Sequence, residues 1–323
     1  MIIGVGLSGL TLYLALQDVS LWEVWGAISG ADWNLVFLTL ALITANGLLK
    51  AWRWQLLLGP LGRKVGLDKF LMSHVSGQML NSVFPLRVGE VSRMVVMGDM
   101  GLGRAFVLGS IGVEKFLDML AYGLLMVGLL SLVPLPDWMG DSGYLFVGMA
   151  ILFSAVIFWI TFRREWAASR LGRLLRWLPA RYRAQGDHFL QSLLASLEVL
   201  KSPADGILLA FSTTLIWATA LAVIHALLLA VGIGLPLRAS LLVLLALQAG
   251  ISVPSAPVKI GVFEYACVLA LSVFGIPQAL GISYGILLHT ILFLPIILLG
   301  LIFYWMLEWH RSQEGQSHIA GQE

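Results

Sequence analysis

The chain contains several apolar segments that are each long enough to cross a membrane as a helix, which takes about 20 predominantly apolar residues. Hydrophobic residues make up 59% of the 323 positions and charged residues only 12%. A soluble domain carries about 25% charged residues, and so little polar cover could not enclose this much apolar surface. We therefore predict an all-α, polytopic helical membrane protein. This excludes a cytosolic globular enzyme, a secreted disulfide scaffold, a disordered chain and a nucleic-acid binder.

About six full spans are expected from the apolar runs. They are predicted at Ile2–Leu16, Asn34–Leu58, Ala105–Val133, Tyr144–Phe162, Gly206–Leu235 and Ile282–Met306. The second span ends with two cations and two tryptophans, which we interpret as an anchor at the membrane interface. The anchor consists of Lys50, Trp52, Arg53 and Trp54.

Basic residues predict how the spans are oriented. Arginines are concentrated in the segment 163–183, and the positive-inside rule places such a loop in the cytoplasm. The short loop that carries Arg63 and Lys64 is also expected to be cytoplasmic, whereas the link Pro134–Gly143 has no basic residue and should face outward. The C-terminus is then cytoplasmic, and the protein is expected in the cell (inner or plasma) membrane.

Two segments, 67–104 and 239–281, are too interrupted to be simple spans. Each begins with an apolar run and then breaks at a proline-containing turn, around Asn81–Pro85 and Ser252–Pro257. Broken helices free backbone polar groups, which at membrane depth are tolerated only inside protein or beside water. We therefore predict two re-entrant helical hairpins.

The two breaks carry proline, a cation, glycine and a carboxylate in the same order. The patterns read Pro85-x-Arg87-x-Gly89-Glu90 and Pro257-x-Lys259-x-Gly261-x-x-Glu264. The predicted orientation makes the hairpins enter from opposite faces, which is typical of an inverted-topology repeat and of a transport site between its halves. We expect the hairpins to break at Pro85, Gly89, Pro254, Pro257 and Gly261.

The repeat divides the chain into two halves and a tail. The predicted units are a first repeat, 1–133, with the cytoplasmic-side hairpin 67–104; a second repeat, 134–306, with the basic cytoplasmic loop 163–203 and the outer-side hairpin 239–281; and a polar cytoplasmic tail, 307–323.

Two carboxylates lie inside a predicted span. Glu114 and Asp118 are four residues apart and share one helix face. A carboxylate at the centre of a span costs a few kcal/mol unless it faces water or a cation. Arginine binds phosphate or carboxylate with two parallel hydrogen bonds, which suits Arg87 and Arg93 to an anionic lipid head group. The candidate substrate-binding residues are Arg87, Glu90, Arg93, Glu114, Asp118, Lys259 and Glu264.

Structural roles for these residues stay open. Glu114 and Asp118 could simply be solvated, and Glu90 could pair with Arg87 and Arg93 to hold the first hairpin. His74, His225 and His289 match no metal spacing and are interpreted as hydrogen-bonded structural residues; Cys267 is interpreted as buried and inert. No catalytic residue, metal or cofactor is predicted.

The motifs resemble a known family, the lysylphosphatidylglycerol synthase transmembrane region, also called flippase-like membrane proteins. The run Pro85–Arg93 followed by Glu114–Asp118 is similar to the family pattern Pro-x-Arg-x-Gly-Glu-x-x-Arg and then Glu-Arg/Lys-x-x-Asp. The run Pro254–Glu264 resembles the second family signature, usually Pro-Gly-Gly-Ile-Gly, with Val258–Lys259 in place of the glycine pair. The resemblance covers nearly the whole chain.

The resemblance implies an integral inner-membrane protein of the lipid-translocase type. In two-part relatives the transmembrane region moves aminoacylated phospholipid between leaflets and a separate soluble domain makes it. Because this chain ends shortly after its last predicted span, a stand-alone form without synthase activity is expected. Membrane lipids are the expected partners, no nucleic acid is expected, and a homodimer and a separate lipid-modifying enzyme stay open.

The leading functional prediction is a flippase-like transporter of a polar-headed lipid, either a phospholipid or a lipid-linked substrate, and not an enzyme. One alternative is a membrane transferase that acts on a lipid-linked substrate with Glu114 or Asp118 as base. Another is a secondary transporter of small soluble solutes.

Overall fold

The computed structural model describes residues 2–17, 19–84, 87–133, 180–252 and 256–320, together with separate residues between 145 and 173. All regular structure in these residues is helical, which confirms the predicted all-α class. In chain order the helices are α1 (Ile2–Leu16), α2 (Leu21–Ser29), α3 (Trp33–Leu57), α4 (Gly59–Gly62), α5 (Leu67–Val83), α6 (Val88–Met97), η1 (Gly98–Leu102), α7 (Arg104–Leu132), α10 (Ala180–Ala195), η2 (Ser196–Lys201), α11 (Pro203–Ala230), α12 (Leu237–Ser252), η3 (Pro257–Lys259), α13 (Val262–Ser272) and α14 (Gln278–Ala320).

Four described helices are long and apolar enough to cross a membrane: α3, α7, α11 and the part of α14 up to Leu307. They correspond to four of the six predicted spans. Helix α1 is apolar but has only 15 residues. Most of Tyr144–Phe162, the whole link Pro134–Gly143 and most of the basic loop 163–183 lie outside the described residues.

The distribution of side chains is that of a protein surrounded by lipid. Phe37, Leu124 and Ile207 expose more than half of their surface on the outside of the long helices, whereas Arg53 and Arg93 are buried at 1% and 4% exposure. A water-soluble protein places its charges outside and its large apolar side chains inside. The inverse pattern is stable only where the outer solvent is itself apolar, so the model supports an integral membrane protein.

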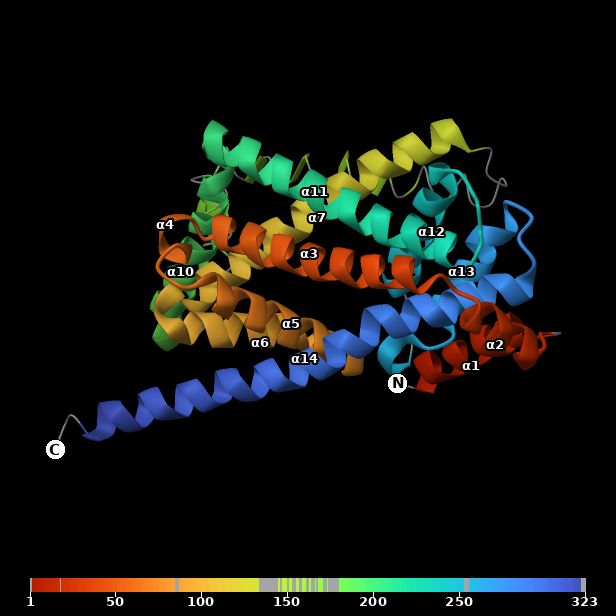
Figure 1. The fold of residues 1–323 in the computed structure, drawn as a ribbon. Helices are drawn as coiled ribbons and strands as arrows, with labels where there is room; N and C mark the ends of the chain where they lie inside the picture. Colours follow the sequence, from red (N-terminus) through yellow and green to blue (C-terminus); the bar gives the residue numbers. More distant parts are fainter. Residues whose placement is uncertain are drawn as a thin grey trace.

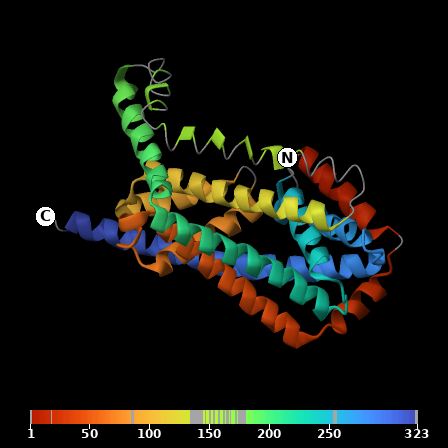
Figure 2. The same ribbon diagram turned by 90° about the horizontal axis from the view of Figure 1, so that it is seen from above.

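The long helices form the centre of the bundle, and two shorter helix pairs lie at its two ends. Helices α5 and α6 (the first pair) lie toward the end that holds α4, and α12 and α13 (the second pair) lie toward the end that holds α2 (Figure 1). Helix α3 packs along α11 between them. Seen from above, α10 leaves the bundle at an angle (Figure 2).

Helix contacts within residues 1–133 resemble those within residues 134–306. Helix α6 packs on α7 as α13 packs on α14, and α5 contacts α3 as α12 contacts α11. The short helices that precede α3 and α11 also make corresponding contacts. Helix α2, before α3, contacts α14, and α10, before α11, contacts α7. Similar helix contacts are therefore made on both sides of residues 134–179, among the helices that the structure describes.

Each helix pair ends in a turn, here called its tip: Phe84 and Arg87 in the first pair, and Ala256–Gly261 in the second. The tips approach each other, since η3 contacts α5. Pro85 and Pro254 lie outside the described residues, and Pro257 is the first residue of η3. Gly261 has a φ of +88° and precedes α13.

Left-handed backbone is concentrated at the tips. Among the described residues, the non-glycine residues with positive φ are Arg87 (54°), Val258 (59°) and Lys259 (64°). Each such residue costs roughly 1–2 kcal/mol because its Cβ crowds the following carbonyl oxygen. Val258 and Lys259 occupy the positions where the family signature has glycines, and they keep the conformation that glycine favours.

Gly89 has a packing role inside α6. A Cβ at this position would collide with the backbone of Gly77 in α5, so the absence of a side chain allows the two helices to touch. The backbone N–H of Gly89 donates to Asn81 Oδ1 at 2.8 Å, which also ties α6 to α5. The first pair is therefore held by close backbone contact as well as by its turn.

The strain at the second tip gives a prediction. Val258→Gly should leave the protein as stable as the wild type or raise its stability by up to about 1 kcal/mol, because relief of the positive φ offsets the added backbone freedom. Thermal unfolding in detergent measures this. Val262→Gly is the matched control: Val262 is buried in α13 with ordinary helical backbone, so its loss should be destabilising. Equal destabilisation by both variants would contradict the prediction.

Candidate functional site

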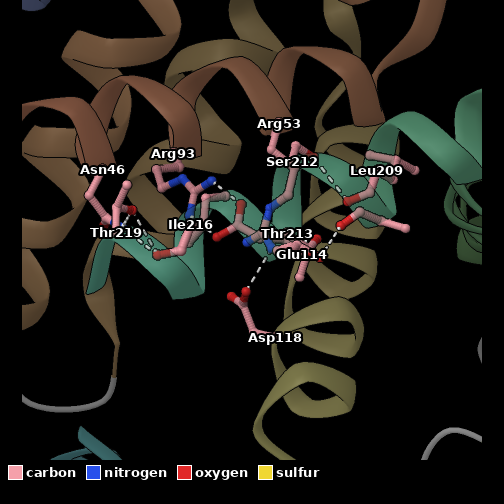
Figure 3. Close-up of polar contacts among 12 residues, drawn as sticks. Asn46, Arg53, Arg93, Glu114, Asp118, Leu209, Ser212, Thr213, Ile216 and Thr219 are labelled. Atoms are coloured by element: carbon pink, nitrogen blue, oxygen red, sulfur yellow. Dashed lines mark hydrogen bonds and ion pairs between the residues drawn. The ribbon is translucent and has the colours of Figure 1, made fainter. Parts of the chain in front are cut away.

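One face of α3 carries polar residues at helical spacing: Asn46, Lys50 and Arg53. Asn46 and Arg53 point toward α11 (Figure 3). The Asn46 side-chain amide donates to Ile216 O at 2.7 Å and to Thr219 Oγ1 at 2.8 Å. These bonds hold α3 against α11.

Arg53 crosses from α3 to two other helices. Its Nη1 lies 2.7 Å from Asp118 Oδ1 in α7 and donates to Thr213 Oγ1 in α11 at 3.2 Å (Figure 3). Its side chain is 1% exposed, whereas that of Asp118 is 31% exposed. One buried guanidinium therefore joins three long helices.

The interfacial anchor predicted at the end of α3 is wrong for Arg53 and Trp54. Both are buried, because the face of α3 that carries them turns toward the other helices. The Trp54 ring packs edge-on against Phe70 at 5.1 Å, and its indole N–H donates to Ser110 Oγ at 3.1 Å.

Arg93 and Glu114 form a second buried ion pair. The Arg93 Nη1 and Nη2 atoms lie 3.3 and 2.6 Å from the two carboxylate oxygens of Glu114, a two-pronged contact between α6 and α7 (Figure 3). The guanidinium also lies over the Trp54 ring, 3.9 Å from its centroid. The sequence left open an ion pair between Arg93 and Glu90. In the structure Arg93 pairs with Glu114 instead.

Glu90 lies at the edge of this network. Its Oε1 is 3.2 Å from Lys115 Nζ and 3.6 Å from Arg87 Nη1. The Arg87 side chain is 64% exposed, so this long contact holds it only weakly. Arg87 keeps most of its hydrogen-bonding capacity free for another group.

Lys259 at the second tip is close to Arg87 at the first. Burial lowers the pKa of the Lys259 amine, and the charge on Arg87 lowers it further. Two cations from distant parts of the chain therefore face the same region, where each repels the other. An anion bound between them would relieve this repulsion.

Glu264 lies apart from the first network, in the second helix pair. Its Oε2 accepts from the backbone N–H of Gly261 at 2.7 Å, and its Oε1 lies 2.5 Å from Nδ1 of His289 in α14. Both side chains are buried. His225 bonds Ser240 Oγ at 2.9 Å, so His225 and His289 have the hydrogen-bonded partners predicted for them, whereas Nδ1 of His74 is buried without one. Cys267 is buried as expected.

The predicted site residues thus fall into two groups. Arg87, Glu90, Arg93, Glu114, Asp118 and Lys259 gather around the first pair and α7, and Glu264 belongs to the second pair. Sequence reasoning missed Arg53 and Lys50 as members of the first group, and His289 as the partner of Glu264. The spacing of Asn46, Lys50 and Arg53 on one face of an apolar helix was the available signal for the first two.

The described residues contain no group of three or more histidine, cysteine, aspartate or glutamate side chains that could hold a metal ion. Unused polar atoms do lie near the first group. Arg53 Nε, Arg93 Nε and His74 Nδ1 are buried without a hydrogen-bond partner. Buried polar atoms normally find partners, so this region has capacity for water or a polar ligand.

These features define a helical integral membrane protein whose long helices enclose a network of paired charges. The family model described as "Lysylphosphatidylglycerol synthase TM region" matches residues 1–300, and the chain belongs to this family. No curated protein and no solved structure matched the chain.

The Arg93–Glu114 pair gives a stability prediction. Arg93→Met should lower the free energy of unfolding by about 3–5 kcal/mol, because it leaves the Glu114 carboxylate buried without its cation. The double variant Arg93→Met, Glu114→Gln should recover much of this loss, since no buried charge is stranded. Unfolding in detergent measures both.

Arg104→Met is the control for this experiment. Arg104 pairs with Asp99 at 2.8 Å, but its side chain is 58% exposed, so its loss should cost about 1 kcal/mol or less. A loss as large as that of Arg93→Met would contradict the assigned role of the buried pair.

Proposed function

We propose that this protein moves a polar-headed lipid, a phospholipid or a lipid-linked substrate, between the membrane leaflets. The lipid phosphate binds between Arg87 and Lys259, where the two tips approach each other. The observation that carries the proposal is the proximity of these two cations, contributed by helix pairs from opposite ends of the bundle.

Family membership supports a lipid substrate. The family is named after the membrane region of a synthase whose product is a phospholipid. The apolar outer surface of the long helices places the protein among lipids, so its substrate can arrive from the bilayer.

The corresponding contacts of the two parts support an inverted repeat. Each helix pair packs on the span that follows it, and the two pairs lie at opposite ends of the bundle. We propose that both pairs are re-entrant hairpins and that residues 1–133 and 134–306 are the two repeats. Transporters of this architecture bind substrate near the midplane, between their broken helices.

Local backbone geometry supports a phosphate site at the tips. Helix N-termini attract anions through the partial positive charge of their free N–H groups. Arg87 directly precedes α6, and the second tip precedes α13. The left-handed conformations of Arg87 and Lys259 are strained, and such strain is concentrated at functional sites in proteins.

The buried pairs serve as the frame of the site in this proposal. Arg93–Glu114 holds α6 on α7, and Arg53–Asp118 holds α3 on α7. Glu90 and Lys115 link this frame to Arg87 at the first tip. The exposed Arg87 can then exchange its weak contact with Glu90 for a phosphate oxygen.

We further propose that the protein is a transporter and not an enzyme, and that it resides in the inner or plasma membrane. The segment 163–183 and the C-terminus face the cytoplasm in this arrangement. The arginines of that segment provide the support for the orientation.

The test is lipid movement in proteoliposomes that contain fluorescent phospholipids. Arg87→Gln and Lys259→Gln should each slow the movement about tenfold or more, because a charge-assisted hydrogen bond contributes roughly 1.5–3 kcal/mol. Arg104→Gln, an exposed arginine away from the tips, should move lipid at the wild-type rate.

Other outcomes separate the competing functions. A wild-type rate in the double variant Arg87→Gln, Lys259→Gln rejects the phosphate site. Chemical turnover of a lipid by the purified protein indicates the transferase alternative. Uptake of water-soluble ligands without lipid movement indicates a solute transporter.

A further inference from the structure

The Glu264–His289 pair is a second buried polar site that the lipid-binding proposal does not use. The two side chains meet at 2.5 Å between α13 and α14, at 6% and 7% exposure. The imidazole is packed against the rings of Phe263 and Phe293, with centroids 4.8 and 4.5 Å away. In such a contact a proton can lie between the carboxyl oxygen and the imidazole nitrogen.

We infer that the Glu264–His289 pair is a proton-binding site that couples lipid movement to a proton gradient. The inference rests on the proposed function for its substrate, but the site itself stands on the geometry of the second helix pair. It supplies an energy source for the directed movement of lipid.

Comparison of the two helix pairs supports this role. Arg93–Glu114 joins α6 to α7, and Glu264–His289 joins α13 to α14, the corresponding helices of the second part. Arginine does not lose its proton in proteins, so the first junction keeps its charges at any physiological pH. Histidine exchanges a proton near neutral pH, so the second junction can change its charge.

A proton on this pair changes how the second tip is held. Glu264 Oε2 accepts the Gly261 N–H at 2.7 Å, two residues beyond Lys259. The tip also rests on α1, where Ser8 Oγ accepts from Ala256 N at 2.9 Å. A second proton gives a neutral carboxylic acid beside an imidazolium, and a hydrogen bond to a neutral carboxyl group is about half as strong as one to a carboxylate.

In this proposal a lower pH loosens the second tip and a higher pH holds it. Acidic pH adds the second proton, weakens the hold on Gly261 and frees the second tip. Loss of that proton to the opposite side restores the carboxylate and the capped tip. One proton is taken up from water and one is returned to water in each cycle, so charge and atoms balance without any other reactant.

Other titratable groups lie on the elements that pack against the helices of this pair. On α13, Cys267 is buried and interacts electrostatically with Glu264. Helix α1 contributes the uncharged Ser8 and Thr11 and the exposed Tyr13. The remaining titratable or charged groups on these elements are Glu23 on α2, Asp68, Lys69 and His74 on α5, Asp205 and His225 on α11, Arg238 on α12, Lys259 on η3, Tyr265 on α13, and Tyr284, Tyr304, Glu308, His310, Arg311, Glu314 and His318 on α14.

The experiment has two arms, both with the full-length protein. Infrared titration in detergent follows the carbonyl stretch of a protonated carboxyl group as the pH falls. Proteoliposomes with fluorescent phospholipid and an imposed pH gradient report the rate of lipid movement. The variants are Glu264→Gln and His289→Gln, and His225→Gln is the matched control because His225 is another partly buried hydrogen-bonded histidine.

The expected result is a wild-type rate that depends on the gradient, by up to about tenfold per pH unit for a single proton. Both Glu264→Gln and His289→Gln should lose this dependence, and His225→Gln should keep it. Glu264→Gln should also lose a carboxyl band that the wild type shows. Glutamine can still accept from Gly261, so the tip stays capped and the variant should fold.

Three results would overturn the inference or part of it. Lipid movement that ignores the gradient in the wild type rejects proton coupling but leaves the transport proposal intact. An infrared titration unchanged by Glu264→Gln rejects the proton site. Absence of lipid movement in the wild type, with a carboxyl band assigned to Glu264, rejects lipid transport and its coupling and leaves a proton-binding membrane protein.

Discussion

The physical constraint on which this structure depends is the cost of charge in an apolar medium. An unpaired buried ion costs several kcal/mol, so each charge inside the bundle must meet its counterpart from another helix. Glu114 and Asp118 lie on one face of α7, and Arg93 and Arg53 reach them from α6 and α3. Hydrophobic burial cannot specify the positions of helices that are already surrounded by lipid. The ion pairs contribute to this specificity, because each one joins two particular helices.

This frame positions the first tip. With α6 fixed on α7 by Arg93, Arg87 lies six residues earlier, at the N-terminal end of α6, where its side chain is 64% exposed. The approach of η3 to α5 then brings Lys259 into the same region. The proposed phosphate site is therefore a consequence of the frame, which brings the two cations toward the same region.

The sequence was sufficient for the helical class, for four spans and for the carboxylate face of α7, because apolar length and helical spacing are local properties. The sequence was insufficient to predict which residues pair with each other in the folded protein. Arg53 near a helix end has two physical solutions, extension to the interface or rotation inward, and only the position of α7 decides between them. His289 is one histidine in an apolar run, and Glu264 becomes its neighbour only when α13 folds back on α14. Val258 and Lys259 show a third limit, since tertiary contacts hold them in a conformation that their own side chains disfavour.

The most direct test of the account is the distance between its two tips in a lipid bilayer. Spin labels at positions 87 and 259, in a variant whose single cysteine, Cys267, is replaced by alanine, report this distance by pulsed dipolar spectroscopy. The account predicts one short distance, well below the hydrocarbon thickness of about 30 Å, because both tips reach the same region from opposite sides. A distance close to that thickness would show that the tips do not meet, and it would contradict a shared site for a lipid head group.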